Sequence, residues 1–171
     1  MTISSKELSR SKVEKLVNRW TQCRRGDFTE QDTATNFILP FLECLGWNIY
    51  DVYEVKQQGY PVSFTQKLPI ESRPLDKPDC IISLNDNPCI VFEFKPLADG
   101  GVIDRYKERI KKLQEKARNL NTRYAILTNF SETIVYGKTN EKPLIRFSHP
   151  TEYLSRFEEL WKCLSKANAD R

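Results

Sequence analysis

Residues 78–95, PDCIISLNDNPCIVFEFK, contain two short apolar runs, 80–84 and 89–92, with a polar turn between them. Runs of this length with so little polarity predict strands that are buried on both faces. With a three-residue loop, 85–87, antiparallel pairing places Leu84 opposite Pro88 and Asp79 opposite Glu93. Because side chains alternate along a strand, Lys95 shares the face of Glu93. The stretch therefore predicts a hairpin with three charged side chains at its open end.

The two carboxylates of this hairpin are expected roughly 5 Å apart, where they repel each other unless a cation lies between them. Mg²⁺, which prefers oxygen ligands and keeps several waters, suits that position. Lys95 beside it would offset charge that develops during hydrolysis of a phosphodiester. The arrangement is thus typical of metal-dependent phosphodiester cleavage, with Mn²⁺ as a substitute for Mg²⁺. The alternative is a structural ion-pair cluster at the end of the sheet.

The spacing of Asp79, Glu93 and Lys95 resembles the motif of the PD-(D/E)xK nuclease superfamily. Further segments extend this resemblance in order along the chain: Glu30-Gln31-Asp32-Thr33, Phe37-Ile38-Leu39-Pro40-Phe41-Leu42, Leu45-Gly46-Trp47, Asp51-Val52-Tyr53-Glu54-Val55 and Arg123-Tyr124-Ala125-Ile126-Leu127-Thr128-Asn129-Phe130. Together they resemble the N-terminal nuclease domain of type I restriction-enzyme R subunits and of related fused restriction-modification enzymes, over about residues 29–137. Two positions depart from the family pattern: Lys112 stands where a glutamine is frequent, and Phe130 replaces a glycine.

The resemblance implies an α/β fold with a restriction-endonuclease-like αβββαβ core, whose mixed sheet of four to five strands is flanked by helices. It implies a Mg²⁺-dependent DNA endonuclease that leaves 5′-phosphate and 3′-hydroxyl ends, in a restriction-type defence system. Asp79, Glu93 and the backbone carbonyl of Phe94 would hold the metal, and Glu30 would be a further active-site acid and metal ligand. Implied partners are a translocase, methyltransferase or specificity subunit or domain, or a second copy of the chain.

Two other acidic residues have both a functional and an ordinary interpretation. Glu30 lies on the predicted buried stripe of its helix and points toward the sheet, yet Thr29 and Asp32 also form a capping-box pattern at the same helix start. Glu54 could add a metal ligand, and a surface or cross-strand charge is the equal alternative.

The segment from Arg105 to Arg118 carries seven Lys and Arg residues against two Glu. Such a face could lie along a DNA backbone, and a solvent-exposed helix face explains it equally well. The candidate nucleic-acid contacts are Arg105, Lys107, Lys111, Lys112 and Gln114. The net charge of +4 permits nucleic-acid binding without requiring it.

The composition predicts one soluble, cytoplasmic domain over residues 1–171, with no membrane partner. The chain has 29% charged and 39% hydrophobic residues, which is ordinary for a globular protein. The five cysteines form no C-x-x-C pair and are expected to be reduced. The single histidine, His149, excludes sites built on paired histidines and makes a Ser-His or Cys-His hydrolase improbable.

Hydrophobic periodicity predicts the remaining elements. Helices are expected over 5–24, 30–45 (kinked at Pro40), 103–120 and 151–166, and strands over 48–56, 80–84, 89–92, 124–128 and 133–136. Residues 57–77 are expected to hold a short strand near 62–66 or a mobile loop that touches the substrate.

Two alternatives to a DNA endonuclease stay open at this point. One is a catalytically silent nuclease-like fold that binds nucleic acid or scaffolds partner proteins. The other is the same chemistry on RNA or on a branched junction.

Overall fold

The structure, a computed structural model, describes residues 4–23, 28–59, 77–97, 106–140 and 142–169. Its centre is a six-stranded mixed sheet in the order β1-β2-β3-β4-β5-β6, in which only β3 and β4 run parallel. The strands are β1 (Val55–Gln57), β2 (Cys80–Leu84), β3 (Asn87–Phe94), β4 (Tyr124–Thr128), β5 (Thr133–Gly137) and β6 (Ile145–Phe147). The predicted α/β class with a helix-flanked mixed sheet is confirmed, with one strand more than expected.

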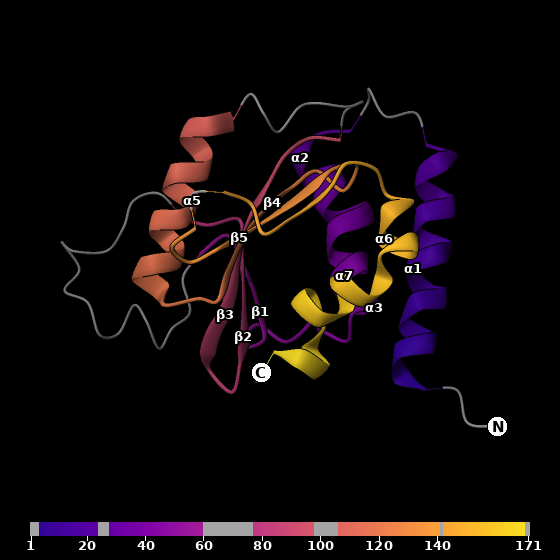
Figure 1. The fold of residues 1–171 in the computed structure, drawn as a ribbon, viewed down its shortest axis with the longest axis horizontal. Coiled ribbons are helices and arrows are strands. Elements are labelled where there is room, and N and C mark those ends of the chain that lie inside the picture. Colours follow the sequence, from indigo (N-terminus) through magenta and orange to yellow (C-terminus); the bar gives the residue numbers. More distant parts are fainter. Residues whose placement is uncertain (1–3, 24–27, 60–76, 98–105, 141, 170–171) are drawn as a thin grey trace.

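Helices cover both faces of this sheet (Figure 1). They are α1 (Ser5–Thr21), α2 (Glu30–Thr33), the π-helical η2 (Ala34–Ile38), α3 (Leu39–Cys44), α5 (Lys107–Leu120), α6 (Glu152–Ser155), α7 (Phe157–Leu164) and the 3₁₀ turn η5 (Lys166–Asn168). Helix α5 covers one face, and the others lie on the opposite face (Figure 1). Each face has its own cluster of buried side chains, so the central strands are apolar on both sides.

The β2–β3 hairpin turns more tightly than the sequence predicted. Asn85 and Asp86 alone form the turn, both with positive φ (50° and 63°), as a type I′ turn requires. Leu84 therefore pairs with Asn87, and the prediction that it pairs with Pro88 is wrong. A β-bulge between Ser83 and Ile82 then shifts the register by one residue, so that Cys80 pairs with Phe92. Continued by one residue beyond the end of β2, this register puts Asp79 across from Glu93.

The helical region that begins at Glu30 contains a π-helical turn just before Pro40. Because Pro40 has no N–H, it cannot bond the carbonyl of Asn36, and the Leu39 N–H instead bonds the carbonyl of Ala34, five residues back. The expected irregularity at Pro40 is thus a π-bulge that separates α2 from α3. The short α2 at the start of this region carries Glu30.

The predicted strand over 48–56 is wrong for most of its length. Side-chain oxygens of Asn48 and Asp51 accept backbone N–H groups two residues on, from Tyr50 (3.2 Å) and Tyr53 (2.9 Å). These local bonds form turns in place of a sheet ladder, and the strand begins only at Val55. The strand or loop expected near 62–66 lies outside the described residues, as do the first residues of the helix expected over 103–120 and Arg105.

Phe130 has a backbone conformation that glycine favours. Its φ is 67°, a left-handed value that costs a bulky residue free energy. The ring is buried and packs against Phe37 and Tyr153, with centroid separations of 5.1 and 5.5 Å. Burial of the ring offsets the strain of the turn.

The C-terminal region differs from the single helix predicted over 151–166. Strand β6 precedes it, and the helix is divided at Arg156 into α6 and α7. The guanidinium group of Arg156 bonds the carbonyl of Arg146 (2.7 Å) and the carboxylate of Glu159 (2.7 Å), which ties this break to β6.

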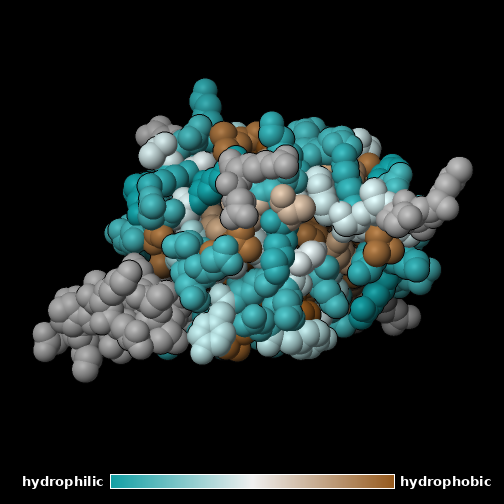
Figure 2. Space-filling view, turned by 90° about the horizontal axis from the view of Figure 1, so that it is seen from below, coloured by the Kyte–Doolittle hydropathy of each residue, from teal (hydrophilic) through white to brown (hydrophobic). Residues whose placement is uncertain are grey.

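Figure 2 views the molecule from the side of the β2–β3 turn, where the surface is mostly hydrophilic and its hydrophobic side chains are scattered. Within the described residues, no helix has the length and apolar character needed to cross a bilayer.

Candidate functional site

Asp79 and Glu93 meet where β2 begins and β3 ends, at the end of the sheet opposite the hairpin turn (Figure 1). The backbone N–H of Phe94 donates a hydrogen bond to Oδ2 of Asp79 at 2.6 Å. The carbonyl of Asp79 accepts from the N–H of Gln58 at 2.8 Å, which continues the pairing of β1 with β2. Asp79 is therefore held from both neighbouring strands, with its carboxylate beside the end of β3.

Glu93 is a buried carboxylate surrounded by cations. Its Oε1 lies 2.9 Å from Nζ of Lys95 and 3.8 Å from the guanidinium group of Arg109, and its Oε2 lies 3.6 Å from Nζ of Lys116. The side chains of Glu93, Lys95 and Lys116 are each only 7% exposed. Because residues 91, 93 and 95 face the same side of the sheet, Glu93 points toward α5, which supplies Arg109 and Lys116.

Lys95 extends past the end of β3 and lies between two helical segments. Its Nζ donates to Oε1 of Glu93 and, at very short range, to the carbonyl of Phe94. It also lies 3.5 Å from Oε2 of Glu30 and 5.5 Å from the ring centroid of Tyr106. One ammonium group thus occupies the point where a carbonyl and two carboxylates converge.

Glu30 comes to this cluster from the start of α2. Thr29 and Asp32 form the predicted capping box, with reciprocal side-chain to backbone bonds of 3.0 and 3.1 Å. The cap leaves the Glu30 side chain free to reach Lys95, so the capping and active-site interpretations are compatible. The hydroxyl of Thr33 accepts from the N–H of Leu97 at 2.7 Å, which ties α2 to the segment that follows β3.

The pKa of Asp79 is raised from 3.8 to about 6. The largest cause is burial of the carboxyl group, followed by the negative charge of Glu93; Glu30 adds a smaller effect in the same direction. The bond from the Phe94 N–H and the charge of Lys95 oppose the rise without cancelling it. Burial and the neighbouring carboxylates therefore disfavour the ionised form of Asp79.

The donors at this end of the sheet are of one chemical kind. Asp79, Glu93, Glu30 and the Phe94 carbonyl all offer oxygen, and a hollow of about 30 Å³ borders Glu30, Asp79 and Phe94. Oxygen donors suit Mg²⁺ and Mn²⁺. However, within the described part of the chain no three Asp, Glu, His or Cys side chains are grouped so as to hold an ion directly. The residue types fit a hard cation, whereas the positions of the oxygens fit the ammonium group of Lys95.

The predicted nucleic-acid contacts are not all on one face. Lys111 and Lys112 are exposed on α5, whereas Gln114 is buried and donates to the carbonyl of Asn140 at 2.6 Å. Its position therefore does not support the prediction that Gln114 contacts nucleic acid. Arg105 and the side chain of Lys107 lie outside what the structure describes.

Glu54 is engaged away from the acid cluster. Its carboxylate bonds Nζ of Lys166 and the N–H of Asn48, both at 2.6 Å. Glu54 is mostly buried and thus joins the turn before β1 to the C-terminal η5 through a structural ion pair, and its position supports neither the metal-ligand nor the surface-charge interpretation.

Two members of the cluster, Arg109 and Lys116, were not among the predicted site residues. They are seven residues apart, or about two helical turns, and so share one face of α5. Lys116 directly precedes the buried Ala117 and lies three residues after the buried Leu113. That spacing was the signal in the sequence that this lysine faces the sheet.

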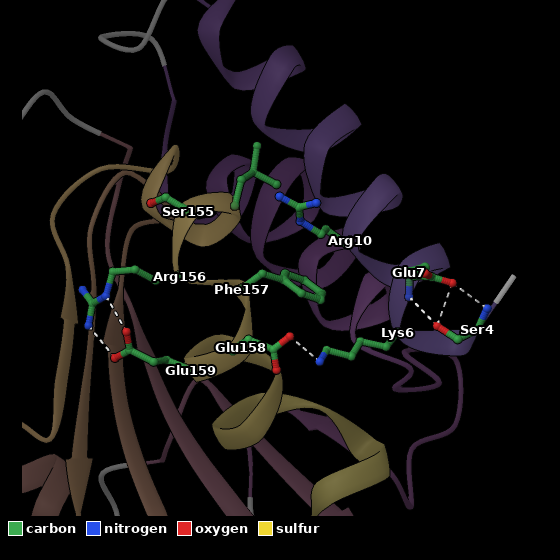
Figure 3. A pocket seen from close by; sticks show the side chains of 10 residues that line it. Ser4, Lys6, Glu7, Arg10, Ser155, Arg156, Phe157, Glu158 and Glu159 are labelled. Atoms are coloured by element: carbon green, nitrogen blue, oxygen red, sulfur yellow. Dashed lines mark hydrogen bonds and ion pairs between the residues drawn. The ribbon is translucent and has the colours of Figure 1, made fainter.

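A second hollow, of about 610 Å³, lies between the start of α1 and the α6–α7 region, away from the acid cluster. Figure 3 shows that four of its charged side chains form two ion pairs: Lys6 with Glu158, and Arg156 with Glu159. Glu7 is held by the N-cap residue Ser4 in the same view. These separate pairs do not converge on a common point, so this hollow is a weaker candidate for a site.

Comparisons with protein-family models, with curated proteins and with solved structures find no match for this chain. The class of protein that the structure itself defines is an α/β protein with a six-stranded mixed sheet between two helical layers. At one end of this sheet lies a cluster of three acids and three cations.

Proposed function

We propose that this chain is a divalent-cation-dependent DNA endonuclease with a site of the PD-(D/E)xK type, on a restriction-endonuclease-like core. The observation that carries the proposal is the convergence of Asp79, Glu93, Lys95 and Glu30 at one end of the sheet, from three different segments of the chain. The sequence resemblance supplied the expectation, and the contacts among these side chains support it.

Asp79, Glu93, the Phe94 carbonyl and Glu30 would hold the cation, Mg²⁺ or Mn²⁺. A cation bound there supplies Lewis-acid chemistry, since it polarises the scissile phosphate and lowers the pKa of a water molecule. Asp79 would bind it better once its proton is lost, and its pKa of about 6 places that loss below neutral pH.

Lys95 supplies the positive charge nearest to the reacting phosphate in this proposal. Its ammonium group would donate to a phosphate oxygen or to the attacking water and offset negative charge in the transition state. Arg109 is half-exposed at the rim of the cluster, where its guanidinium group can also reach a phosphate of the substrate. Lys116 is buried and stays with Glu93.

Cutting both strands of DNA needs two sites, because one such site hydrolyses one phosphodiester bond. A second copy of this chain is one source of the second site. A translocase, methyltransferase or specificity partner would supply target choice, which nothing in the described surface provides in a recognisable form. Lys111 and Lys112, exposed on α5, are the remaining described candidates for contacts with the DNA backbone.

One observation favours a second candidate function, a silent module that only binds nucleic acid or partner proteins. Each of the three acids already has a cationic or backbone partner, as in a structural ion-pair cluster. Such a module would bind DNA equally well with or without Mg²⁺ and with or without Lys95.

Nicking of supercoiled plasmid by the purified chain separates the two functions. We expect nicking in Mg²⁺ or Mn²⁺, no nicking in EDTA, and loss of at least about 100-fold in Lys95→Ala. Lys15→Ala, which removes an exposed lysine of α1 away from the acid cluster and from α5, is the matched control for surface charge. A folded protein that binds DNA but shows no cation-dependent nicking would favour the silent module, and labelled RNA and junction substrates would test the same chemistry on other nucleic acids.

A further inference from the structure

Lys95 makes an unusual set of contacts for a lysine that is to assist a reaction. Its ammonium group bonds Glu93 and the Phe94 carbonyl and lies 3.5 Å from Glu30. These are the oxygens that the proposed function assigns to the cation. A divalent cation and the ammonium group cannot occupy one point, because their charges repel and both require the same lone pairs.

The ammonium group has little room to share this position with water. The side chain of Lys95 is 7% exposed, and the Tyr106 ring lies 5.5 Å from its Nζ. A buried ammonium group depends on its partners for the hydrogen bonds that water would otherwise supply. The oxygens of Glu93, Phe94 and Glu30 therefore hold the ammonium group firmly. Any ligand that binds these oxygens must replace the positive charge and the hydrogen bonds that Lys95 provides.

Glu93 would not be left without a counter-charge if Lys95 moved. Arg109 lies 3.8 Å from its Oε1 and Lys116 lies 3.6 Å from its Oε2. Two cations from α5 thus remain beside the carboxylate when the ammonium group of Lys95 leaves.

We propose that Lys95 is an internal competitor for the cation site: its ammonium group holds the oxygens of Glu93, Phe94 and Glu30, and cation binding displaces it from them. This inference rests on the proposed function and adds a regulation of the same site. Cation binding both fills the site and releases Lys95, so the lysine becomes available to a substrate phosphate only when the cation is present.

The test compares Lys95→Met with the unaltered chain and with Lys112→Met, a control on the exposed surface of α5. Binding of Mn²⁺ is measured by the electron paramagnetic resonance of free Mn²⁺, and binding of Mg²⁺ by calorimetry, without DNA. We expect Lys95→Met to bind either cation about tenfold tighter or more, because a unit positive charge that competes for the ligands is gone. Lys112→Met should differ from the unaltered chain by less than about twofold, since its charge is in water.

Thermal unfolding in EDTA and in Mg²⁺ gives a second readout that tolerates a poorly folded variant. Mg²⁺ should raise the Tm of Lys95→Met by more than that of the unaltered chain, or should restore its folding, because the cation takes the place of the missing ammonium group. Equal or weaker cation binding by Lys95→Met, or a variant that no Mg²⁺ concentration refolds, overturns the inference.

The outcomes also separate this inference from the proposed function. If the unaltered chain nicks DNA with Mg²⁺ but Lys95→Met binds the cation no more tightly, only the competition is wrong. If neither protein binds a divalent cation, the competition and the metal-dependent nuclease are both wrong. Tight binding by the variant alone would support the competition even where the unaltered chain binds weakly.

Discussion

Replacing Asp79 by asparagine is expected to make the protein more stable at neutral pH. The pKa of Asp79 is about 6 in the folded protein, against 3.8 as its ordinary value, chiefly because of burial and of the charge on Glu93. A folded-state pKa above the unfolded one means that the folded state holds the proton more tightly. Ionisation therefore costs stability progressively as the pH rises from about 4 to about 6, and the whole cost is present above that window.

The magnitude follows from the difference between the two pKa values. One pKa unit corresponds to about 1.4 kcal/mol, so the change from 3.8 to about 6 sets an upper limit of about 3 kcal/mol. Because Asp79 is only partly buried, water screens part of this effect, and we expect about 1–2 kcal/mol. Asparagine has nearly the same size, and its carbonyl oxygen can still accept the bond from the Phe94 N–H.

Urea unfolding in EDTA at a series of pH values measures this effect. At pH 7.5 we expect Asp79→Asn to exceed the unaltered chain by about 1–2 kcal/mol in free energy of unfolding, and near pH 4 the gain should vanish. Asp79→Ala is the matched control: it also removes the charge but leaves the Phe94 N–H without an acceptor, so it should be about 1 kcal/mol less stable than Asp79→Asn. A variant that gains nothing at pH 7.5, or gains equally at pH 4, would refute the reasoning.

Three further substitutions test the packing around the site and the turns, each by urea unfolding. Lys116→Met should lower the free energy of unfolding by about 1–3 kcal/mol, since it removes a buried partner of Glu93, whereas Lys112→Met should change it by less than about 0.5 kcal/mol. Asp86→Gly should raise it by about 0.5–1 kcal/mol, because glycine adopts the positive φ of the second turn position without strain. Phe130→Gly should lower it by about 2–4 kcal/mol through loss of the buried ring, and Phe130→Ala should be about 1 kcal/mol lower still, because alanine keeps the strain at φ 67°. The reverse order of the glycine and alanine variants would contradict the strained turn.

The strands at the centre of the sheet could be predicted from the sequence because both their faces are buried. Burial makes 80–84 and 124–128 continuous apolar runs, and β2 and β4 have these bounds in the structure. The same logic placed Asp79 across from Glu93, although the loop assumed for it was one residue too long. The β-bulge adds one residue to β3 and so restores the predicted register beyond it. We found no residue pattern in the hairpin that predicts this bulge.

The elements that the sequence did not predict are those decided by a few polar contacts. The turn from Asn48 to Glu54 replaces a strand because two side chains bond nearby N–H groups, although the apolar residues of this segment suggested a strand. Strand β6 is a three-residue edge strand with one buried position, so it has almost no hydrophobic signal. Lys116 was counted as part of a charged surface because lysines are usually exposed, although its spacing from Leu113 and Ala117 places it on the helix face that meets the sheet and Glu93.

The effect of the acid cluster on the free energy of unfolding helps to decide whether the cluster is functional or structural. Buried ion pairs are commonly matched or exceeded in stability by apolar residues of similar size, and the raised pKa of Asp79 marks a position that lowers stability at neutral pH. A cluster retained for stability alone would have no reason to keep Asp79 ionised beside Glu93. A cluster that must bind a cation needs carboxylates at this position even where burial disfavours their ionised form, and the loss of stability is then the expected cost of a functional site. Substitution of Asp79 thus distinguishes the two interpretations. If Asp79 belongs to a functional cation site, Asp79→Asn should gain stability and lose cation binding. If the cluster is only structural, the variant should lose stability.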